Sequence, residues 1–583
     1  MHEERILKNL VLKRLTNAVE VFLKKIQKLE DYPKCKIRLE YSRNEKFGDY
    51  STSFLMENKA ILGNPLENQK IFLDCFEKNE IFSEITFTPP GFINFRIDRN
   101  FLLNYVKNFS SLGENLFPKV ANSEKIIFEF VSANPTGPLN IVSARAAANG
   151  DSICNLLEAI GHEVFREFYV NDYGNQVFLL GVSCVCRLRE FLGENMQVQA
   201  EEDESSLQEL LEKNILPKEG YRGEYLIEIT KDLYNEHKSN IDFLLKEKNY
   251  FSLAEKFSIW AVEKILSTHK FDLEKFGVHF DNFFSERSLH DSGKVLAVLE
   301  YLKDDLKEED GKKIFLSTKY GDDKDRVVVR EDGRPTYLLA DIAYHKDKME
   351  RGFQRMINIW GPDHHGYIAR LSGAIQSMGY KKEVFQVLIA QQVNLISKGE
   401  KVKMSKRLGK FQTMSELLEF LGEKSKDVAR YFFTTRALET PLDFDLDLAV
   451  EESEKNPVFY VQYAHARICS IFREVEMDIN EEDFLNLPFT KEREELLFWI
   501  ARFPEEVLDA AKAMEPHRLT IYLQNLCKAF SKFYIAKENK LKDCNKKEKN
   551  GLGYLCNLTA ICIRETLNLL KVSAPEIMER EKV

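Results

Sequence analysis

Residues 125–139, Lys-Ile-Ile-Phe-Glu-Phe-Val-Ser-Ala-Asn-Pro-Thr-Gly-Pro-Leu, decide the fold of this chain. The apolar run that opens the stretch predicts a β-strand, and the Pro and Gly residues after it predict a turn. The small residues of 143–148, Ser-Ala-Arg-Ala-Ala-Ala, then predict a helix. Because the first N–H groups of a helix have no intrahelical partner, this strand-turn-helix unit predicts an anion-binding site.

A second stretch, Lys403-Met404-Ser405-Lys406-Arg407, predicts the other half of that site. Gly399 and Gly409 flank it, which favours a loop over a packed element. Two lysines on a glycine-hinged loop are suited to closing over phosphate groups. The two stretches together predict a site at which the α-phosphate of ATP is attacked.

Outward from the first stretch, predicted strands and helices alternate over residues 116–425. The predicted strands cover residues 126–131, 163–170, 314–317, 326–330, 356–360 and 384–389. This alternation predicts a multidomain α/β protein whose central domain is a doubly wound parallel sheet. A helical insertion is expected at about 179–276, and it carries the acidic stretch 201–204.

The two ends of the chain predict separate domains. Residues 1–115 combine an amphipathic helix (residues 6–23) with strands at 37–40, 85–88 and 91–97, which predicts a small α+β module. From 426 to 583 we expect the strands to vanish. Helical patterns at 451–474, 492–512, 516–538 and 555–570 predict an all-helical bundle.

Composition excludes several classes of protein. The 583 residues are 44% hydrophobic and 30% charged, and no apolar run approaches the ~18 residues of a membrane helix. The net charge of −10 argues against a nucleic-acid partner. Phosphate groups, however, are attracted by local basic surfaces, which a net charge does not reveal. Residues 537–549 predict either such a face or a solvated loop. Ten cysteines without CxxC spacing argue against zinc and favour the reducing cytoplasm.

Five stretches together carry a resemblance to a known family. They are residues 129–151, 169–176 (Tyr-Val-Asn-Asp-Tyr-Gly-Asn-Gln), 360–367 (Trp-Gly-Pro-Asp-His-His-Gly-Tyr), 403–407 and 516–526. In these stretches the chain resembles bacterial arginyl-tRNA synthetases, which are class I aminoacyl-tRNA synthetases, from end to end. The resemblance implies a Rossmann-like catalytic domain, an N-terminal domain that touches tRNA and a C-terminal anticodon-binding bundle. The alternative for the N-terminal module is a folding appendage.

The resemblance assigns an ATP-binding region and four catalytic residues. The region comprises Ala133, Asn134, Pro135, Thr136, Gly137, Pro138, Leu139, Asn140, Ile141, Val142, Ser143, Met404 and Ser405, and the catalytic residues are Asn140, Ser143, Lys403 and Lys406. The family's His-Ile-Gly-His tetrad is here Asn140-Ile141-Val142-Ser143. Two neutral donors replace two histidines, which weakens phosphate contacts by about 1–2 kcal/mol, and Val142 crowds adenine. The alternative is a non-catalytic paralogue that keeps the fold.

Recognition of arginine demands carboxylates, because a guanidinium offers fixed N–H donors and no acceptor. Tyr337 and Asp341 are four residues apart, so on a helix they share one face. The resemblance places them at the arginine side chain, adds Glu286 as a second acid, and places Asn134 at the substrate's α-amino or carboxylate end. Asp172 and Gln176 are weaker candidates. The alternatives are that Asp341 only pairs with Arg351 or Lys348 and that Tyr337 is a core aromatic.

Two further groups of residues are candidates. His364 and His365 follow a predicted strand, at the sheet edge where ligands bind, and contact with ATP or substrate is favoured over metal binding. Magnesium is expected to arrive with ATP, without a dedicated metal site. Tyr460, Tyr463 and Arg467 mix aromatic and cationic groups that anticodon bases require, with bundle core as the alternative.

The resemblance implies an arginine–tRNA ligase. Its partners are expected to be tRNA(Arg), L-arginine and ATP, with no membrane, and the protein is expected to act as a cytoplasmic monomer. The resemblance also implies that tRNA binds before arginine is activated. Two rival classes remain: an RNA-binding protein without catalysis, and a class I enzyme for lysine or glutamate.

Overall fold

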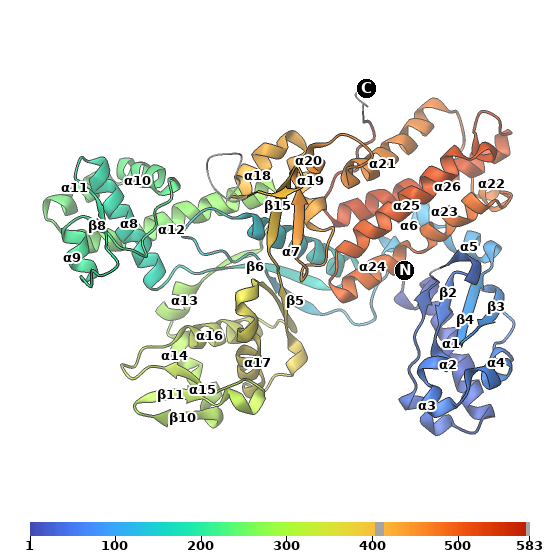
Figure 1. The fold of residues 1–583 in the computed structure, drawn as a ribbon, viewed down its shortest axis with the longest axis horizontal. Helices are drawn as coiled ribbons and strands as arrows, with labels where there is room; N and C mark the ends of the chain where they lie inside the picture. Colours follow the sequence, from blue (N-terminus) through green and yellow to red (C-terminus); the bar gives the residue numbers. More distant parts are fainter. Residues whose placement is uncertain (43, 403–412, 579–583) are drawn as a thin grey trace. The chain divides into compact units, whose positions relative to one another are not determined.

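Strand β5 (Lys125–Glu129) lies at the centre of a five-stranded parallel sheet in the computed structural model, which describes residues 1–42, 44–402 and 413–578 (Figure 1). The strand order is β14-β13-β5-β6-β9. The other four strands are β6 (Glu163–Val170), β9 (Asn282–Ser285), β13 (Arg355–Trp360) and β14 (Phe385–Ile389). Ile126, Ile127 and Phe128 are fully buried. Their unbroken apolar run is typical of a parallel strand that is covered on both faces.

Helix α7 (Ile141–Ala159) returns the chain from β5 to β6. A Cβ atom on Gly150 would lie 2.5 Å from the ring of Phe130, so only glycine lets the helix approach the strand end this closely. From β5 the sheet grows in one direction through β6 and β9 and in the other through β13 and β14. Ligands of such sheets bind where the direction reverses, at the carboxyl ends of β5 and β13.

Two of the predicted strands do not belong to the parallel sheet, and that part of the prediction is wrong. β11 (Lys312–Phe315) and β12 (Arg326–Val329) form a separate antiparallel sheet with β10 (Leu306–Glu309). The pair Asp310-Gly311, with φ of 51° and 73°, makes the tight turn between β10 and β11. Such turns build hairpins, not crossovers. The fifth strand of the parallel sheet is β9, which was not predicted because its four residues are too few for a recognisable pattern.

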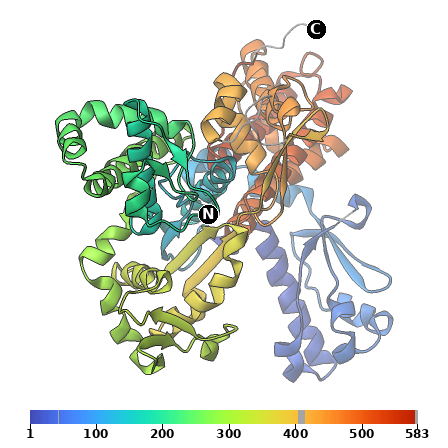
Figure 2. The ribbon, with the colours of Figure 1, turned by 60° about the vertical axis from the view of Figure 1, so that its left-hand side comes forward.

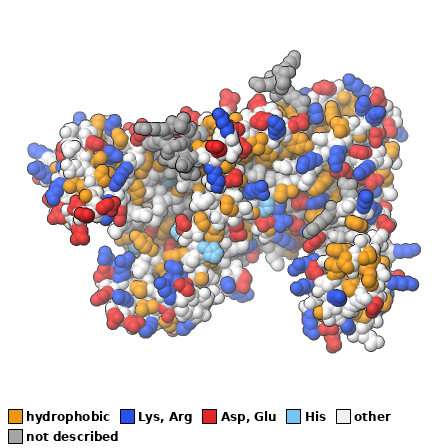
Figure 3. Space-filling model, viewed as in Figure 1, with side chains coloured by type: hydrophobic (Ala, Val, Ile, Leu, Met, Phe, Trp, Pro, Cys, Tyr) orange, Lys and Arg blue, Asp and Glu red, His pale blue; other side chains and the backbone are white. Residues whose placement is uncertain are grey.

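Five helices lie between β6 and β9 and form a lobe with its own core (teal to green in Figure 2). They are α8 (Asn175–Phe191), α9 (Leu207–Glu212), α10 (Tyr225–Glu236), α11 (Lys238–Lys246) and α12 (Tyr250–Lys275), with short strands β7 (Gln197–Val198) and β8 (Ile215–Leu216). Gly181 of α8 lies against Ala254 of α12, where a Cβ atom would meet a carbonyl oxygen. Acidic side chains gather on the surface of this lobe (Figure 3).

The remaining elements of this part of the chain flank the sheet. They are α13 (Glu286–Asp291), α14 (Lys294–Ala297), α15 (Leu299–Leu302), α16 (Tyr337–Glu350), α17 (Ile368–Ser377), α18 (Met414–Leu421), α19 (Ser425–Phe433), α20 (Leu446–Val450), β15 (Val393–Ser397), β16 (Glu400–Lys401) and β17 (Leu442–Asp445). β17 pairs in parallel with β15. The expectation that strands vanish from residue 426 is therefore wrong, because a partner almost 50 residues earlier recruits this short segment.

The chain divides into two units. Apart from the end of α7, the elements above belong to one of them, residues 124–154 and 162–450. The other unit comprises residues 1–123, 155–161 and 451–583. The predicted domain 1–115 falls within that second unit, whereas the predicted domain 426–583 is divided, because residues 426–450 belong to the first unit. The boundaries predicted from the sequence therefore remain a prediction.

The N-terminal part of the second unit is the expected α+β module. Its antiparallel sheet has the order β1-β2-β4-β3. The elements are α1 (Leu7–Lys25), β1 (Glu40–Tyr41), β2 (Tyr50–Thr52), α2 (Phe54–Glu57), α3 (Lys59–Leu62), α4 (Pro65–Leu73), β3 (Phe82–Thr88), β4 (Phe92–Ile97), α5 (Arg99–Val106) and α6 (Phe109–Leu112). Val11, Leu15, Phe22 and Leu23 of α1 are fully buried, as the amphipathic pattern predicts.

The C-terminal part is helical from residue 457. Its helices are α21 (Pro457–Glu474), α22 (Glu481–Leu485), α23 (Lys491–Ala501), α24 (Phe503–Ala513), α25 (His517–Ile535) and α26 (Lys546–Leu569). The predicted helix 492–512 is two helices, because Pro504 is accommodated only in the first turn of a new helix. None of the described helices is long and apolar enough to cross a membrane.

Candidate active site

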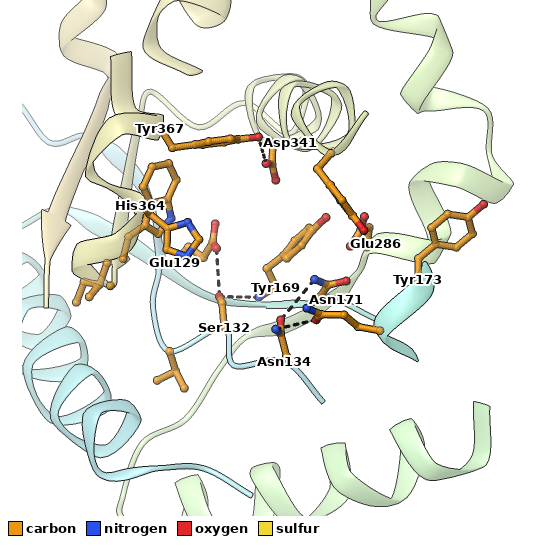
Figure 4. Close-up of a pocket in the computed structure, with 16 residues that line it drawn as sticks. Glu129, Ser132, Asn134, Tyr169, Asn171, Tyr173, Glu286, Asp341, His364 and Tyr367 are labelled. Atoms are coloured by element: carbon orange, nitrogen blue, oxygen red, sulfur yellow. Dashed lines mark hydrogen bonds between the residues drawn. The ribbon is translucent and has the colours of Figure 1, made fainter. Parts of the chain in front are cut away.

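A cavity of about 490 Å³ opens at the carboxyl ends of β5 and β13, where the topology predicts a ligand site (Figure 4). Segments that follow three neighbouring strands meet there with helices α13 and α16. The lining residues are Glu129, Val131, Ser132, Asn134, Tyr169, Asn171, Tyr173, Gln176, Glu286, Tyr337, Asp341, Ile359, Trp360, Gly361, His364 and Tyr367.

The backbone at the end of β5 is strained. Val131 and Ser132 have φ of 67° and 37°, a region that a β-branched residue such as valine rarely adopts. Hydrogen bonds hold Ser132 in place: its hydroxyl donates to Glu129 Oε1 at 3.1 Å and accepts from the Tyr169 N–H at 3.1 Å. Strain of this kind persists only where the surroundings fix it, and it is commonest at functional sites.

Glu129 is an acid of the cavity that was not predicted from the sequence. Lys348, which is fully buried, donates to Glu129 Oε2 at 2.6 Å, and Asn358 donates to the same atom at 3.0 Å. A buried carboxylate needs such partners to stay charged. The sequence offered one signal for this residue, because Glu129 is an acid at the end of an otherwise apolar strand.

Glu286 and Asp341 are the other two acids, and both have raised pKa values. Burial, with the negative charges of Asp341 and Asp172 nearby, raises the pKa of Glu286 to about 7, although a hydrogen bond from Tyr169 lowers it. Burial also raises the pKa of Asp341 to about 6, opposed by a hydrogen bond from Tyr367. Two carboxyl groups therefore face a cavity whose electrostatics favour a cation.

The alternative structural roles of Asp341 and Tyr337 are not observed. Lys348 pairs with Glu129, and Arg351 pairs with Glu167 and Asp347. No lysine or arginine within the described residues forms an ion pair with Glu286 or Asp341. Tyr337 is 62% exposed, so it is not a core aromatic.

The amide side chains of the cavity are hydrogen-bonded to one another. Asn134 Nδ2 donates to Gln176 Oε1 at 3.1 Å, and Asn171 Nδ2 donates to Asn134 Oδ1 at 3.4 Å. Asp172 is not among the lining residues. Its carboxylate accepts from the Ser285 hydroxyl at 2.6 Å and from the Arg287 N–H at 2.9 Å, so it fixes the start of α13 next to Glu286.

Residues 133–140 of the predicted ATP-binding region form the loop between β5 and α7, and residues 141–143 begin the helix. Asn140 Oδ1 accepts from the Ser143 N–H at 2.8 Å and from the Ser143 hydroxyl at 3.1 Å. The Ser143 hydroxyl is therefore already engaged as a donor, which the sequence did not predict. Pro135, Leu139 and Ile141 are buried, while Ala133, Thr136, Gly137, Val142 and Ser143 are half-buried and Asn134, Pro138 and Asn140 are exposed.

The whole of the second predicted motif, residues 403–407, lies outside the described residues, and with it the predicted site residues Lys403, Met404, Ser405 and Lys406. The segment just after them is anchored on the first motif: the Met414 N–H donates to the Leu139 carbonyl at 2.8 Å, and the backbone of Thr413 pairs with that of Asn140.

His364 lines the cavity beside Trp360, whereas His365 does not. Within residues 1–42, 44–402 and 413–578, no three His, Cys, Asp or Glu side chains converge as a metal site. His364 stays a candidate for substrate contact because it lines the cavity.

In the helical bundle, two of the three predicted RNA-contacting residues line a second cavity, of about 180 Å³. The Arg467 guanidinium lies 5.1 Å from the ring of Tyr463 and 4.9 Å from that of Tyr534. Tyr460 instead shares a 3.2 Å hydrogen bond with Ser531 and does not line this cavity.

Three family models match this chain. The model described as "tRNA synthetases class I (R), catalytic domain" matches residues 106–431, "Arginyl tRNA synthetase N terminal domain" matches 13–97, and "DALR anticodon binding domain" matches 461–578. The parallel sheet, the cavity at its switch point and the first of these matches define the catalytic domain of a class I tRNA synthetase.

Curated relatives narrow the class. An arginine–tRNA ligase from Leptospira interrogans serovar Lai is 58% identical over the full length of both chains. One from Bacillus subtilis is 42% identical, covering 93% of this chain and 94% of the relative. The chain belongs to the arginine–tRNA ligase family. Among solved structures, Thermus thermophilus arginyl-tRNA synthetase has a TM-score of 0.73 over 97% of this chain, and at 20% identity it shows likeness of fold.

Proposed function

We propose that this protein joins L-arginine to tRNA(Arg) in two steps driven by ATP. The arginine carboxylate oxygen attacks the α-phosphorus of ATP, and the bond to diphosphate breaks. A hydroxyl of the terminal tRNA ribose then attacks the carbonyl carbon of arginyl-adenylate, and AMP leaves. Neither step needs a side-chain nucleophile, so catalysis rests on positioning and on stabilisation of charge.

The single observation that carries the choice of arginine is the pair Glu286 and Asp341. Both face a cavity of about 490 Å³ without a lysine or arginine partner among the described residues. A guanidinium carries a positive charge and parallel donors, which match two carboxylates. Glutamate would be repelled there. Lysine would bring the charge but not the fork of donors.

The charge and hydrogen-bonding groups of the lining residues indicate which end of the arginine substrate each one contacts. We assign the arginine side chain to Glu286, Asp341 and Tyr337, and the substrate's α-ammonium end to Glu129 and Asn134. Glu129 suits an ammonium group because its Oε1 faces Ser132 at the strand end, while Oε2 is held by Lys348. Gln176 supports Asn134 through their hydrogen bond, and Asp172 acts through α13.

ATP is assigned to the turn before α7. The N–H groups at the start of this helix and the amide of Asn140 offer donors to phosphates, and Asn140 Oδ1 is turned toward Ser143. Lys403 and Lys406 supply positive charge for the departing diphosphate. Magnesium enters as a complex with ATP and is not assigned a site of its own.

The bundle is assigned to the anticodon. The Arg467 guanidinium between two tyrosine rings provides a flat cationic surface, which suits splayed bases. The ten cysteines, all within the described residues, are thiols and not disulfides, which supports a cytoplasmic location. A monomer is proposed, to be measured by light scattering.

The test is a charging assay with purified protein, ATP, bulk tRNA and radiolabelled arginine, lysine or glutamate in separate reactions. We expect acid-precipitable label with arginine only, with release of AMP and diphosphate. Charging with lysine or glutamate in place of arginine would show that the protein is a class I enzyme for that amino acid. Binding of tRNA without any charging would support the non-catalytic alternative.

A further inference from the structure

The loop that follows β5 is held by side chains from outside the parallel sheet. The Tyr225 hydroxyl donates to the Thr136 carbonyl at 2.5 Å, and His269 Nε2 lies 2.7 Å from the Gly137 carbonyl. Tyr225 is the first residue of α10 and His269 lies near the end of α12. Both helices belong to the lobe inserted between β6 and β9.

The sequence of the loop explains why carbonyl groups are the points of attachment. Pro135 and Pro138 have no N–H, so the loop lacks two of its backbone donors. Gly137, between them, is the most freely rotating residue of the stretch. A Cβ atom on Gly137 would lie 3.4 Å from the Tyr225 hydroxyl, which shows how closely the tyrosine approaches. Donors from other segments, bonded to the carbonyl groups of Thr136 and Gly137, therefore fix this loop.

The hydrogen bond of His269 to Gly137 leaves the other ring nitrogen, Nδ1, buried and unpaired among the described residues. The side chain is fully buried, and burial lowers its pKa. Because a carbonyl oxygen can only accept, the hydrogen bond to Gly137 requires the proton of the ring to be on Nε2. A leucine would fill the space without leaving a polar atom unpaired. The ring also packs beside Phe168, with the two ring centroids 6.2 Å apart, but only the bond to Gly137 requires a ring nitrogen at this position.

The same turn of α12 also reaches the segment that follows the second motif. Asp272, three residues after His269, accepts a hydrogen bond from Ser415 at the start of α18. Thr413 and Met414, next to Ser415, pair with the backbone of Asn140 and Leu139. The end of α12 thus contacts both segments that the proposed ATP site requires.

We propose that His269 and Tyr225 are positioning residues of the ATP site, which hold the Thr136-Gly137 carbonyls so that the Asn140 turn and the start of α7 receive the phosphates. Neither side chain touches ATP. Asp272 extends the same support to α18 through Ser415. This inference rests on the proposed function and extends it to the inserted lobe, which contributes to nucleotide binding through these three side chains.

Four variants test the proposal. Tyr225→Phe deletes one hydroxyl. His269→Leu deletes the donor and keeps the volume, while His269→Gln places an amide nitrogen where Nε2 stood. The matched control is Tyr234→Phe, which deletes a hydroxyl bonded to Asp242 elsewhere in the same lobe.

The readout is the KM for ATP against the KM for arginine in charging assays. One hydrogen bond is worth about fivefold in an equilibrium constant, so we expect Tyr225→Phe and His269→Leu to raise the KM for ATP about fivefold or more. The KM for arginine should stay within about twofold, on the scale of that bond. His269→Gln should recover most of the ATP affinity, and Tyr234→Phe should match the unaltered protein. Unchanged ATP use in Tyr225→Phe, or equal losses for both substrates, would overturn the proposal.

Failure of the proposed function is recognised separately, because the unaltered protein must charge arginine before the variants are compared. If it does not, calorimetric binding of ATP to Tyr225→Phe and Tyr234→Phe still decides the inference. Weaker ATP binding in the first alone supports it, and equal binding refutes it. If His269→Leu does not fold, the comparison of Tyr225→Phe and His269→Gln with the unaltered protein is sufficient to support or overturn the proposal.

Discussion

The Tyr367 hydroxyl donates a 2.6 Å hydrogen bond to Asp341 Oδ2 on the wall of the cavity. Tyr367 ends the short 3-10 helix after β13, whereas Asp341 lies on α16. This bond stabilises the carboxylate and opposes the burial that raises its pKa. The balance of the two effects sets the pH at which Asp341 becomes charged.

Arginine use should depend on pH. Glu286 and Asp341 have pKa values of about 7 and about 6 in the free protein, and a bound guanidinium favours their charged forms. Affinity is therefore complete only near pH 8 and above, where both groups are charged, and it is lost as the pH falls through these two values. We expect the KM for arginine to rise on the order of tenfold between pH 8 and pH 6. Calorimetry at pH 6.5 in two buffers should detect protons released on binding, and Glu286→Gln should flatten the profile.

Tyr367→Phe should move this profile toward higher pH. Without its hydrogen bond, Asp341 keeps only the influences that raise its pKa, apart from the charge of Lys348. Loss of one bond shifts a pKa by about 0.5–1 unit. The measurement is the KM for arginine as a function of pH. A profile that moves to lower pH, or stays in place, would show that the hydroxyl does not stabilise the carboxylate.

Asp341→Asn should impair arginine binding alone. It removes one of the two charges assigned to the guanidinium, a contact worth about 1.5–3 kcal/mol, so the KM for arginine should rise about 10- to 100-fold. The KM for ATP should stay within about twofold, because no atom of ATP is assigned to this group. Glu350→Gln, on the same helix and paired with Lys346, is the control and should behave as the unaltered protein.

Arg467→Gln should weaken tRNA use without affecting the small substrates. It removes the cation between Tyr463 and Tyr534, and loss of such a stacking contact costs about 1–3 kcal/mol. We expect kcat/KM for tRNA to fall about 5- to 100-fold. Arg564→Gln, whose guanidinium pairs with neighbouring Glu565, serves as the control. Equal losses in both variants would indicate a general charge effect and not a contact at this cavity.

Glu505→Ala should destabilise the unit that contains both chain ends. The buried carboxylate accepts from Tyr50 at 2.5 Å, from Tyr41 at 2.6 Å and from the Lys8 N–H at 3.0 Å. Its removal leaves three donors without an acceptor, so the free energy of unfolding should fall by about 3 kcal/mol. Glu495→Ala, which breaks a more exposed pair with Lys532, should cost less than about 1 kcal/mol. Denaturant unfolding of the two variants checks the difference.

Much of the fold was predictable because its signals are local. The run of apolar residues in 126–128 and the Pro-Thr-Gly-Pro turn specify a strand, a turn and a helix within 25 residues. The spacing of Tyr337 and Asp341 placed them on one helix face, and both line the cavity. Patterns of three or four residues carry this information without reference to the rest of the chain.

Other features were not predictable, because their partners are remote. β17 exists through pairing with β15, and β9 through pairing with β6. The hairpin β10–β11 is a different case, because its Asp310-Gly311 turn is a local signal that the prediction did not use. Edge strands of four residues are set by what they pair with more than by their own composition.

By itself, the sequence determined which segments become strand, turn and helix, and which residue types carry nucleotide and cation chemistry, since these depend on neighbours along the chain. Only the tertiary structure decided that Glu129 is held by Lys348, 219 residues away, and that Glu286 and Asp341 face one cavity without a partner of opposite charge among the described residues. Charge balance in a buried site depends on groups brought together by packing, and no local pattern records it.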